Sequence, residues 1–172
     1  DRILNIFPQF KFYKRLKNFK NLDTTLKVEY DFKIILAILI VDHSDNYEFF
    51  CFKYKVSNDL KNRLKIISNY YDSIKNSSFF SDINLRKLIY FLGKRTVKDL
   101  LLFSRFSENK LKDSDLLKKF KFINKYKIPK FPISGSDLKE YGYEKSQELG
   151  LKLKSLEDKW INNNFILEDQ FL

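Results

Sequence analysis

Glycine and proline, the residues that most readily interrupt helices, are concentrated in one part of this 172-residue chain. The chain has four glycines and three prolines, and five of these seven lie between Pro129 and Gly150. Elsewhere long stretches contain neither residue, and Leu, Ile, Lys and Asn are abundant. Such sequences favour helices joined by short polar turns. The sequence therefore predicts an all-α fold.

Apolar residues recur at helical spacing behind residues that favour helix N-termini. Leu60, Leu64, Ile67 and Tyr71 follow Ser57 at intervals of four, three and four. Three more helices are expected to start at Ser81 or Asp82, at Thr96 and at Ser114, and the first of these is expected to stop at Gly93. The basic aromatic segment 10–21 also has a helical pattern, because Phe12, Leu16 and Phe19 fall at helical spacing.

The longest apolar run, Ile34 to Val41, is compatible with a buried strand or with a buried helix. Periodicity alone does not separate the two for an unbroken apolar run. Because the neighbouring segments are helical in pattern, we predict a helix that is apolar all round and lies at the centre of a helical body.

The sequence divides near Ile128–Pro132 into a body of serial antiparallel helices, residues 1–127, and a small helical tail, residues 128–172. In the tail, Ser134–Leu138 is typical of a turn that leads into a helix, and Gly142 of a helix stop. From Glu144 to Asn163 the pattern predicts one amphipathic helix with an apolar face of Leu149, Leu153, Leu156 and Trp160.

The formal charge is +11 and the isoelectric point is about 9.5. This balance suits a nucleic acid or an anionic membrane surface, although a lysine-rich proteome would give the same composition. A lone Cys51 and a lone His43 exclude an internal disulfide and a zinc site, and no metal site is expected in this chain. With no signal peptide and no apolar run long enough for a bilayer, the chain is expected to be cytoplasmic and not bound to a membrane. Because it begins with Asp1, it is expected to be a fragment of a longer protein.

Lysines, glycines and hydroxyl side chains meet near two expected helix starts in the tail, and two cations follow Gly93 in the body. Helix N-termini with nearby cations favour an anionic backbone. Solvated cations and ordinary helix capping by Asp137 are the alternatives. The candidate anion-binding residues are Lys94, Arg95, Lys130, Ser134, Gly135, Ser136, Lys139, Lys145, Ser146 and Lys152.

Four groups of residues together resemble the C-terminal half of bacterial class II tRNA nucleotidyltransferases, the CCA-adding enzymes, and the related bacterial poly(A) polymerases. The matching sequences are Val56–Asn58 with Arg63–Leu64; Tyr90–Gly93 with Asp99–Leu102; Lys130–Leu138 with Gly142; and Gly150, Glu157–Asp158, Trp160 and Phe165. Two positions depart from the family pattern: Lys145–Gln147 stands where many members have Pro-Gly-Pro, and Phe91 stands where many have Arg.

The resemblance implies a function in tRNA 3′-end processing. Such enzymes add C, C and A from CTP and ATP, with Mg²⁺ held by carboxylates of an N-terminal head. Their body and tail hold the acceptor and T arms of tRNA, which makes the candidate residues above RNA-binding residues. No Gly-Ser followed by a strand-borne Asp-x-Asp is present here, so this chain alone is expected to have no catalytic residues, and ATP, CTP and Mg²⁺ would be bound by a missing head.

Two alternatives to a CCA-adding enzyme stay open at this point. The chain is also compatible with a non-catalytic, basic helical module that binds a protein partner. It is compatible with the equivalent half of a poly(A) polymerase, whose product differs but whose body and tail are alike. The sequence carries no signal for an oligomeric state.

Overall fold

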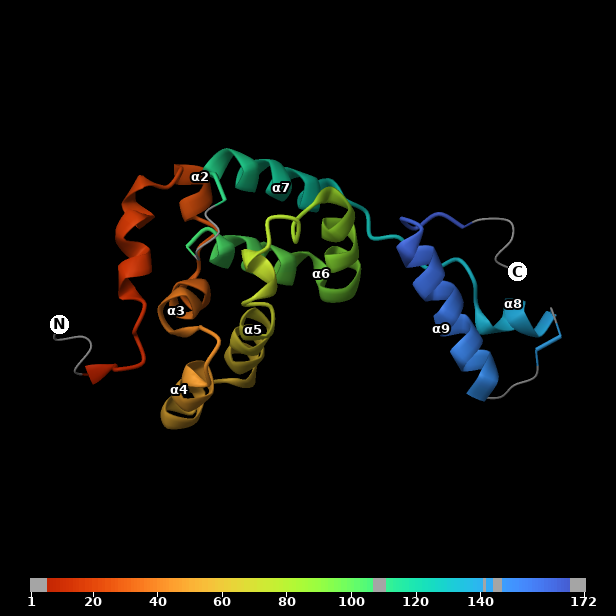
Figure 1. Cartoon of the computed structure of the whole chain (residues 1–172), viewed down its shortest axis with the longest axis horizontal. Coiled ribbons are helices and arrows are strands. Elements are labelled where there is room, and N and C mark those ends of the chain that lie inside the picture. The colour runs from red at the N-terminus through yellow and green to blue at the C-terminus, as the bar shows by residue number, and fades with distance from the viewer. Residues whose placement is uncertain (1–5, 107–110, 141, 144–146, 168–172) are drawn as a thin grey trace. The chain divides into compact units, whose positions relative to one another are not determined.

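A computed structural model describes residues 6–106, 111–140, 142–143 and 147–167 (Figure 1). It divides into two compact units, Asp1–Tyr126 and Lys127–Leu172, which we call the body and the tail. Helices are the only regular elements in these described ranges, which confirms the predicted all-α class. Over the same ranges, no helix is both long and apolar enough to cross a bilayer.

The body contains two 3₁₀ helices and six α-helices among its described residues. They are η1 (Tyr13–Asn21), α2 (Thr24–Lys27), α3 (Phe32–Ile40), α4 (Asn46–Tyr54), α5 (Asn58–Asn69), η2 (Ser73–Lys75), α6 (Asp82–Ser104) and α7 (Asp113–Lys125). The tail contains α8 (Gly135–Glu140) and α9 (Gln147–Asn162).

Helix α3 lies at the centre of the body, as predicted for the apolar run. The Asp31 side chain caps it by accepting a hydrogen bond from the Ile34 backbone N–H at 3.0 Å. Ile34, Ala37 and Ile38 are fully buried. The helix packs against η1, α4, α5 and α6, and only Phe32 in its first turn is largely exposed. A helix can be apolar all round only where it is enclosed in this way.

Three of the four predicted helix starts are confirmed, including the start of α6 at Asp82 with Ser81 at its N-cap, and the fourth is wrong. The Ser57 hydroxyl accepts a hydrogen bond from the Leu60 backbone N–H at 3.3 Å, and α7 begins at Asp113, one residue before the predicted Ser114. Helix α6 consists of two helical segments that meet at a kink at Gly93, which confirms the predicted stop there. The second segment begins directly after Gly93, so Thr96 lies within it and does not start it. Gly93 has φ 78° and ψ 160°, a conformation that is open to glycine and costly for other residues.

The first basic segment also differs from the expected pattern, because residues 13–21 form a 3₁₀ helix. A 3₁₀ helix has three residues per turn, so side chains three apart share a face. Leu16 and Phe19 pack against the core and Leu22 is buried, which makes three the period of the apolar face. The α-helical spacing had placed Phe12 on that face, but with a period of three it lies one position away. The Arg15 guanidinium stacks on the Phe12 ring, with Arg15 Cζ 3.9 Å from the ring centroid.

The tail has its own small core between α8 and α9. Ile133, Leu138 and Leu156 are buried, and Leu149 and Leu153 pack against them. Trp160 contacts the rings of Phe131 and Phe165. Helix α8 ends at Glu140, and Gly142 follows it with φ 89°. The backbone N–H groups of Gly142 and Tyr143 donate to the carbonyls of Lys139 and Leu138. This Schellman geometry confirms the predicted helix stop.

Gly93 and Gly150 give a matched pair of glycine-to-alanine predictions. Gly93→Ala should lower the free energy of unfolding of the body by about 1 to 3 kcal/mol, because alanine resists the conformation of Gly93. Gly150→Ala should raise the stability of the tail by about 0.5 to 1 kcal/mol, since Gly150 lies within α9 and an added Cβ meets nothing within 4 Å. Urea unfolding followed by circular dichroism and by the fluorescence of Trp160, the single tryptophan, measures both. Equal stability of Gly93→Ala and wild type would contradict the geometry at Gly93.

Candidate nucleic-acid interface

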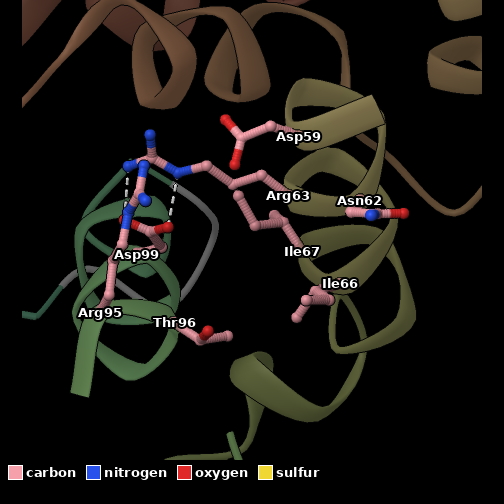
Figure 2. A pocket seen from close by; sticks show the side chains of 8 residues that line it. All are labelled: Asp59, Asn62, Arg63, Ile66, Ile67, Arg95, Thr96 and Asp99. Atoms are coloured by element: carbon pink, nitrogen blue, oxygen red, sulfur yellow. Dashed lines mark hydrogen bonds and ion pairs between the residues drawn. The ribbon is translucent and has the colours of Figure 1, made fainter. Parts of the chain in front are cut away.

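Arg63 and Asp99 form a bidentate ion pair between α5 and α6 (Figure 2). Arg63 Nε donates to Asp99 Oδ2 at 2.5 Å, and Arg63 Nη2 donates to Asp99 Oδ1 at 2.6 Å. The side chains are 11% and 7% exposed. Parallel N–H···O bonds of this kind fix both distance and orientation. The pair therefore sets how α5 lies against α6.

The same guanidinium also reaches the start of α3. Arg63 Nη1 donates to Asp31 Oδ2 at 2.5 Å, while the other Asp31 oxygen caps α3. Burial raises the pKa of the Asp99 carboxyl despite its bonds to Arg63. Asp31 is less buried, so its hydrogen bonds outweigh its burial and lower its pKa. One arginine thus connects α3, α5 and α6.

Two cavities lie on either side of this ion pair and share Arg63, Arg95 and Asp99 in their walls. The smaller has a volume of about 140 Å³ and is also lined by Asp59, Asn62, Ile66, Ile67 and Thr96 (Figure 2). The larger has a volume of about 350 Å³ and is also lined by Glu29, Asp31, Lys94, Lys98, Leu102 and Asn124. Two of the candidate residues from the sequence, Lys94 and Arg95, therefore lie together on a hollowed surface of the body.

The cations around these cavities differ in whether they have partners. Lys94 Nζ donates to the Asn124 carbonyl at 3.0 Å, at the C-terminal end of α7, and Lys98 pairs with Glu29 at 3.6 Å. Arg95 is exposed and makes no hydrogen bond or ion pair with the described residues. Arg95 is thus the group at this site that can bind an anion without giving up an internal contact.

The acidic side chains near the two cavities are paired with cations. Over the ranges that the structure describes, no group of three or more His, Cys, Asp or Glu side chains is placed to hold a metal ion. The carboxylates near the cavities are bound to cations of the body: Asp99 and Asp31 to Arg63, Asp59 to Lys33, and Glu29 to Lys98. Arg95 is left as an exposed cation in the wall of both cavities.

In the tail, the candidate residues at the start of α8 are occupied by capping. The Ser134 hydroxyl donates to Asp137 Oδ2 at 2.8 Å, the Ser134 backbone N–H donates to the same oxygen at 2.7 Å, and the hydroxyls of Ser134 and Ser136 are 2.6 Å apart. These bonds lower the pKa of Asp137, which keeps a negative charge at this helix N-terminus. The structure therefore shows ordinary capping at the start of α8, and the Asp137 carboxylate lies where a bound anion was expected.

The other candidate residues of the tail differ in exposure. Lys130 and Lys139 are exposed, while Lys152 is partly buried with its Nζ 5.8 Å from the ring centroid of Tyr143. Gly135 approaches α9 closely, because a Cβ there would lie 3.4 Å from Leu149. Lys145 and Ser146 lie outside the described residues. All ten candidate residues stay predictions as RNA contacts.

Sequence reasoning missed the Arg63–Asp99 pair, although both residues lie in motifs that carry the resemblance. A signal was present: Asp99 is followed by the apolar run Leu100–Phe103 and becomes buried with it. A buried carboxylate requires a partner, and Arg63 adjoins the apolar face of α5 that begins at Leu60.

Comparison with known proteins gives one similar sequence. A stretch of 68 residues is 35% identical to a protein of Danio rerio described as CCA tRNA nucleotidyltransferase 1, mitochondrial. The match covers 40% of this chain and 14% of that protein, so the chain spans a small part of that relative's length. Neither a protein-family model nor a solved structure matches the chain.

The Arg63–Asp99 pair predicts an asymmetric response to mutation. Asp99→Leu leaves the largely buried guanidinium without its bidentate partner and should lower the free energy of unfolding by about 3 to 5 kcal/mol. The double variant Arg63→Met, Asp99→Leu removes both charges and should be clearly more stable than Asp99→Leu alone. Urea denaturation of the four members of this cycle measures the coupling.

The surface pair of Lys33 with Asp59 is the control for this cycle. Lys33→Ala breaks an ion pair whose carboxylate is 58% exposed and should change stability little. If Asp99→Leu cost no more than Lys33→Ala, the central role of the Arg63 pair would be wrong.

Proposed function

We propose that this chain is the tRNA-binding portion of a CCA-adding tRNA nucleotidyltransferase of the bacterial class II type. The observation that carries the proposal is the 68-residue similarity to the zebrafish CCA tRNA nucleotidyltransferase. The all-α fold and the formal charge of +11 support it, because a polyanionic substrate is held by cations on a rigid scaffold.

In this proposal the body and the tail hold the acceptor and T arms of tRNA by phosphate contacts and shape. Double-helical RNA hides its base edges from side chains, so backbone contacts position it without reading its sequence. Arg95 would contact phosphate directly, and Lys94 would add positive potential while it caps α7. In the tail, Lys130, Lys139, Lys145 and Lys152 would serve as anchors.

The three small residues at the start of α8 take a supporting role in this proposal. Ser134 and Ser136 bond within their own cap, so an RNA backbone would approach their exposed edges and not displace Asp137. Gly135 packs against α9 and fixes the cap in place. Ser146 would allow a near approach of the backbone.

Catalysis would belong to another part of the parent protein. A separate head would bind ATP, CTP and Mg²⁺ and transfer nucleotides to the 3′ end that this chain positions. The cytoplasmic location expected from the sequence stays a prediction, and the name of the zebrafish relative refers to mitochondria.

The proposal predicts direct and salt-dependent tRNA binding by the chain itself. Binding should weaken steeply between low and moderate salt, because each lysine or arginine that meets a phosphate releases counterions. The double variant Lys94→Gln, Arg95→Gln should make the salt dependence weaker, with the magnitude of the slope of log K against log salt reduced by about 1 to 2. Filter binding or gel shifts with a tRNA transcript over a salt series measure this.

Matched lysines and a matched ligand make the test specific. Lys61→Gln with Lys65→Gln removes the same charge from the exposed face of α5 and should leave the slope nearly unchanged. A dsDNA of equal phosphate number should bind more weakly than tRNA. No binding of tRNA at low salt would refute the proposal.

A further inference from the structure

Lysines recur at every third position along helix η1 and just before it. Lys11 precedes η1, and Lys14, Lys17 and Lys20 lie within it, all four exposed. None of the four makes an ion pair or a side-chain hydrogen bond with the described residues. We call Lys14, Lys17 and Lys20 the lysine row.

The 3₁₀ geometry aligns these lysines. With three residues per turn and a rise of about 2.0 Å per residue, side chains at i, i+3 and i+6 lie above one another about 6 Å apart. In an α-helix the same residues would rotate around the axis by about 60° at each step. The alignment is therefore a property of the observed structure and was not visible from the α-helical spacing assumed for the sequence.

The other two faces of η1 are used for packing. Leu16 and Phe19 contact the core, and η1 packs against α3. Arg15 Nη1 donates to the carbonyls of Ile38 at 3.1 Å and Val41 at 2.8 Å, at the end of α3. These contacts hold η1 in place, so the lysine row is displayed on a fixed support.

Negative charge is scarce around the row. No acidic residue occurs in the chain from Ile6 to Leu22. The Asp23 carboxylate is bonded to Thr25, and Asp45 shares a cavity of about 260 Å³ with Lys11. Lys27 Nζ donates to the Lys20 carbonyl at 2.8 Å and adds a cation at the end of η1. Acidic side chains therefore lie near the two ends of this segment, Asp45 beside Lys11 and Asp113 bonded to the Asp23 backbone N–H, and none lies within it.

We propose that the lysine row binds the sugar–phosphate backbone of one RNA strand, one phosphate for each lysine. The phosphates of a strand recur at regular intervals, and the lysines of the row recur at a regular spacing of about 6 Å. This inference rests on the proposed function in taking tRNA as the RNA, and it adds a contact surface on η1 to the ten candidate residues.

The arrangement favours RNA over an anionic membrane surface. A helix that binds a membrane presents apolar side chains to the bilayer beside its lysines. In η1 the apolar side chains Leu16 and Phe19 are turned into the core. Tyr13, which is 43% exposed, is the one large apolar side chain on the surface among the described residues of η1. A regular row of separated charges beside a single aromatic ring suits a polymer with a regular charge repeat better than a bilayer.

The test compares two triple variants of the full chain with equal charge. Lys14→Gln, Lys17→Gln, Lys20→Gln should weaken tRNA binding at low salt roughly 10- to 100-fold and reduce the salt slope by about 2 to 3. The control Lys55→Gln, Lys61→Gln, Lys65→Gln changes exposed lysines at and before α5 and should weaken binding much less. Circular dichroism and thermal unfolding verify that both variants are folded.

Lysine acetylation of the wild-type protein gives a readout that needs no variant. Mass spectrometry should show Lys14, Lys17 and Lys20 protected when tRNA is bound, with Lys61 and Lys65 modified as in the free protein.

If tRNA binds and the two triple variants behave alike with the row unprotected, this inference is overturned and the proposed function stands. If tRNA does not bind, the proposed function fails first. Row-dependent binding of phosphatidylserine vesicles without RNA binding would overturn the inference in favour of a membrane.

Discussion

The body depends on one guanidinium, that of Arg63, which binds Asp99 of α6 and the capping Asp31 of α3 from its own position on α5. The opposite end of α3 is held by a second arginine, because Arg15 donates to the carbonyls of Ile38 and Val41. An acidic cap at the N-terminus and a cation at the C-terminus both suit the helix dipole. The central apolar helix is thus fixed at its two ends by polar contacts and along its length by packing.

These contacts separate the cations of the body into two groups with different roles. Arg15, Arg63 and Lys98 are bound to carbonyls or carboxylates of the protein and stabilise the fold. Arg95 and the lysine row are exposed on supports that the first group holds rigid. A net charge of +11 says only that cations exceed anions, whereas the structure distinguishes the cations that are bound to other groups of the protein from those that are exposed.

The sequence predicts much of the fold and less of the surface. Local signals such as Ser57 before α5, and Gly142 after α8, identified helix ends correctly because their effect is confined to one turn. The Arg63–Asp99 pair joins residues 36 apart and follows from tertiary packing, so local patterns could not show it. The 3₁₀ helix was misread because three-residue and four-residue spacing overlap in a short segment, and with it the alignment of the lysines was lost. At the start of α8 the structure shows capping by Asp137, which is the alternative to anion binding at this helix N-terminus.

The central claim is that this chain holds tRNA for a catalytic head, and nucleotide incorporation tests it most directly. The chain would be mixed with a separately produced head fragment of a CCA-adding enzyme, radiolabelled CTP and ATP, Mg²⁺ and a tRNA that lacks its 3′ CCA. The account predicts that incorporation rises above that of the head fragment alone, in proportion to added chain, with tRNA and not with an unstructured RNA of equal length. Unchanged incorporation at chain concentrations that saturate tRNA binding would contradict it.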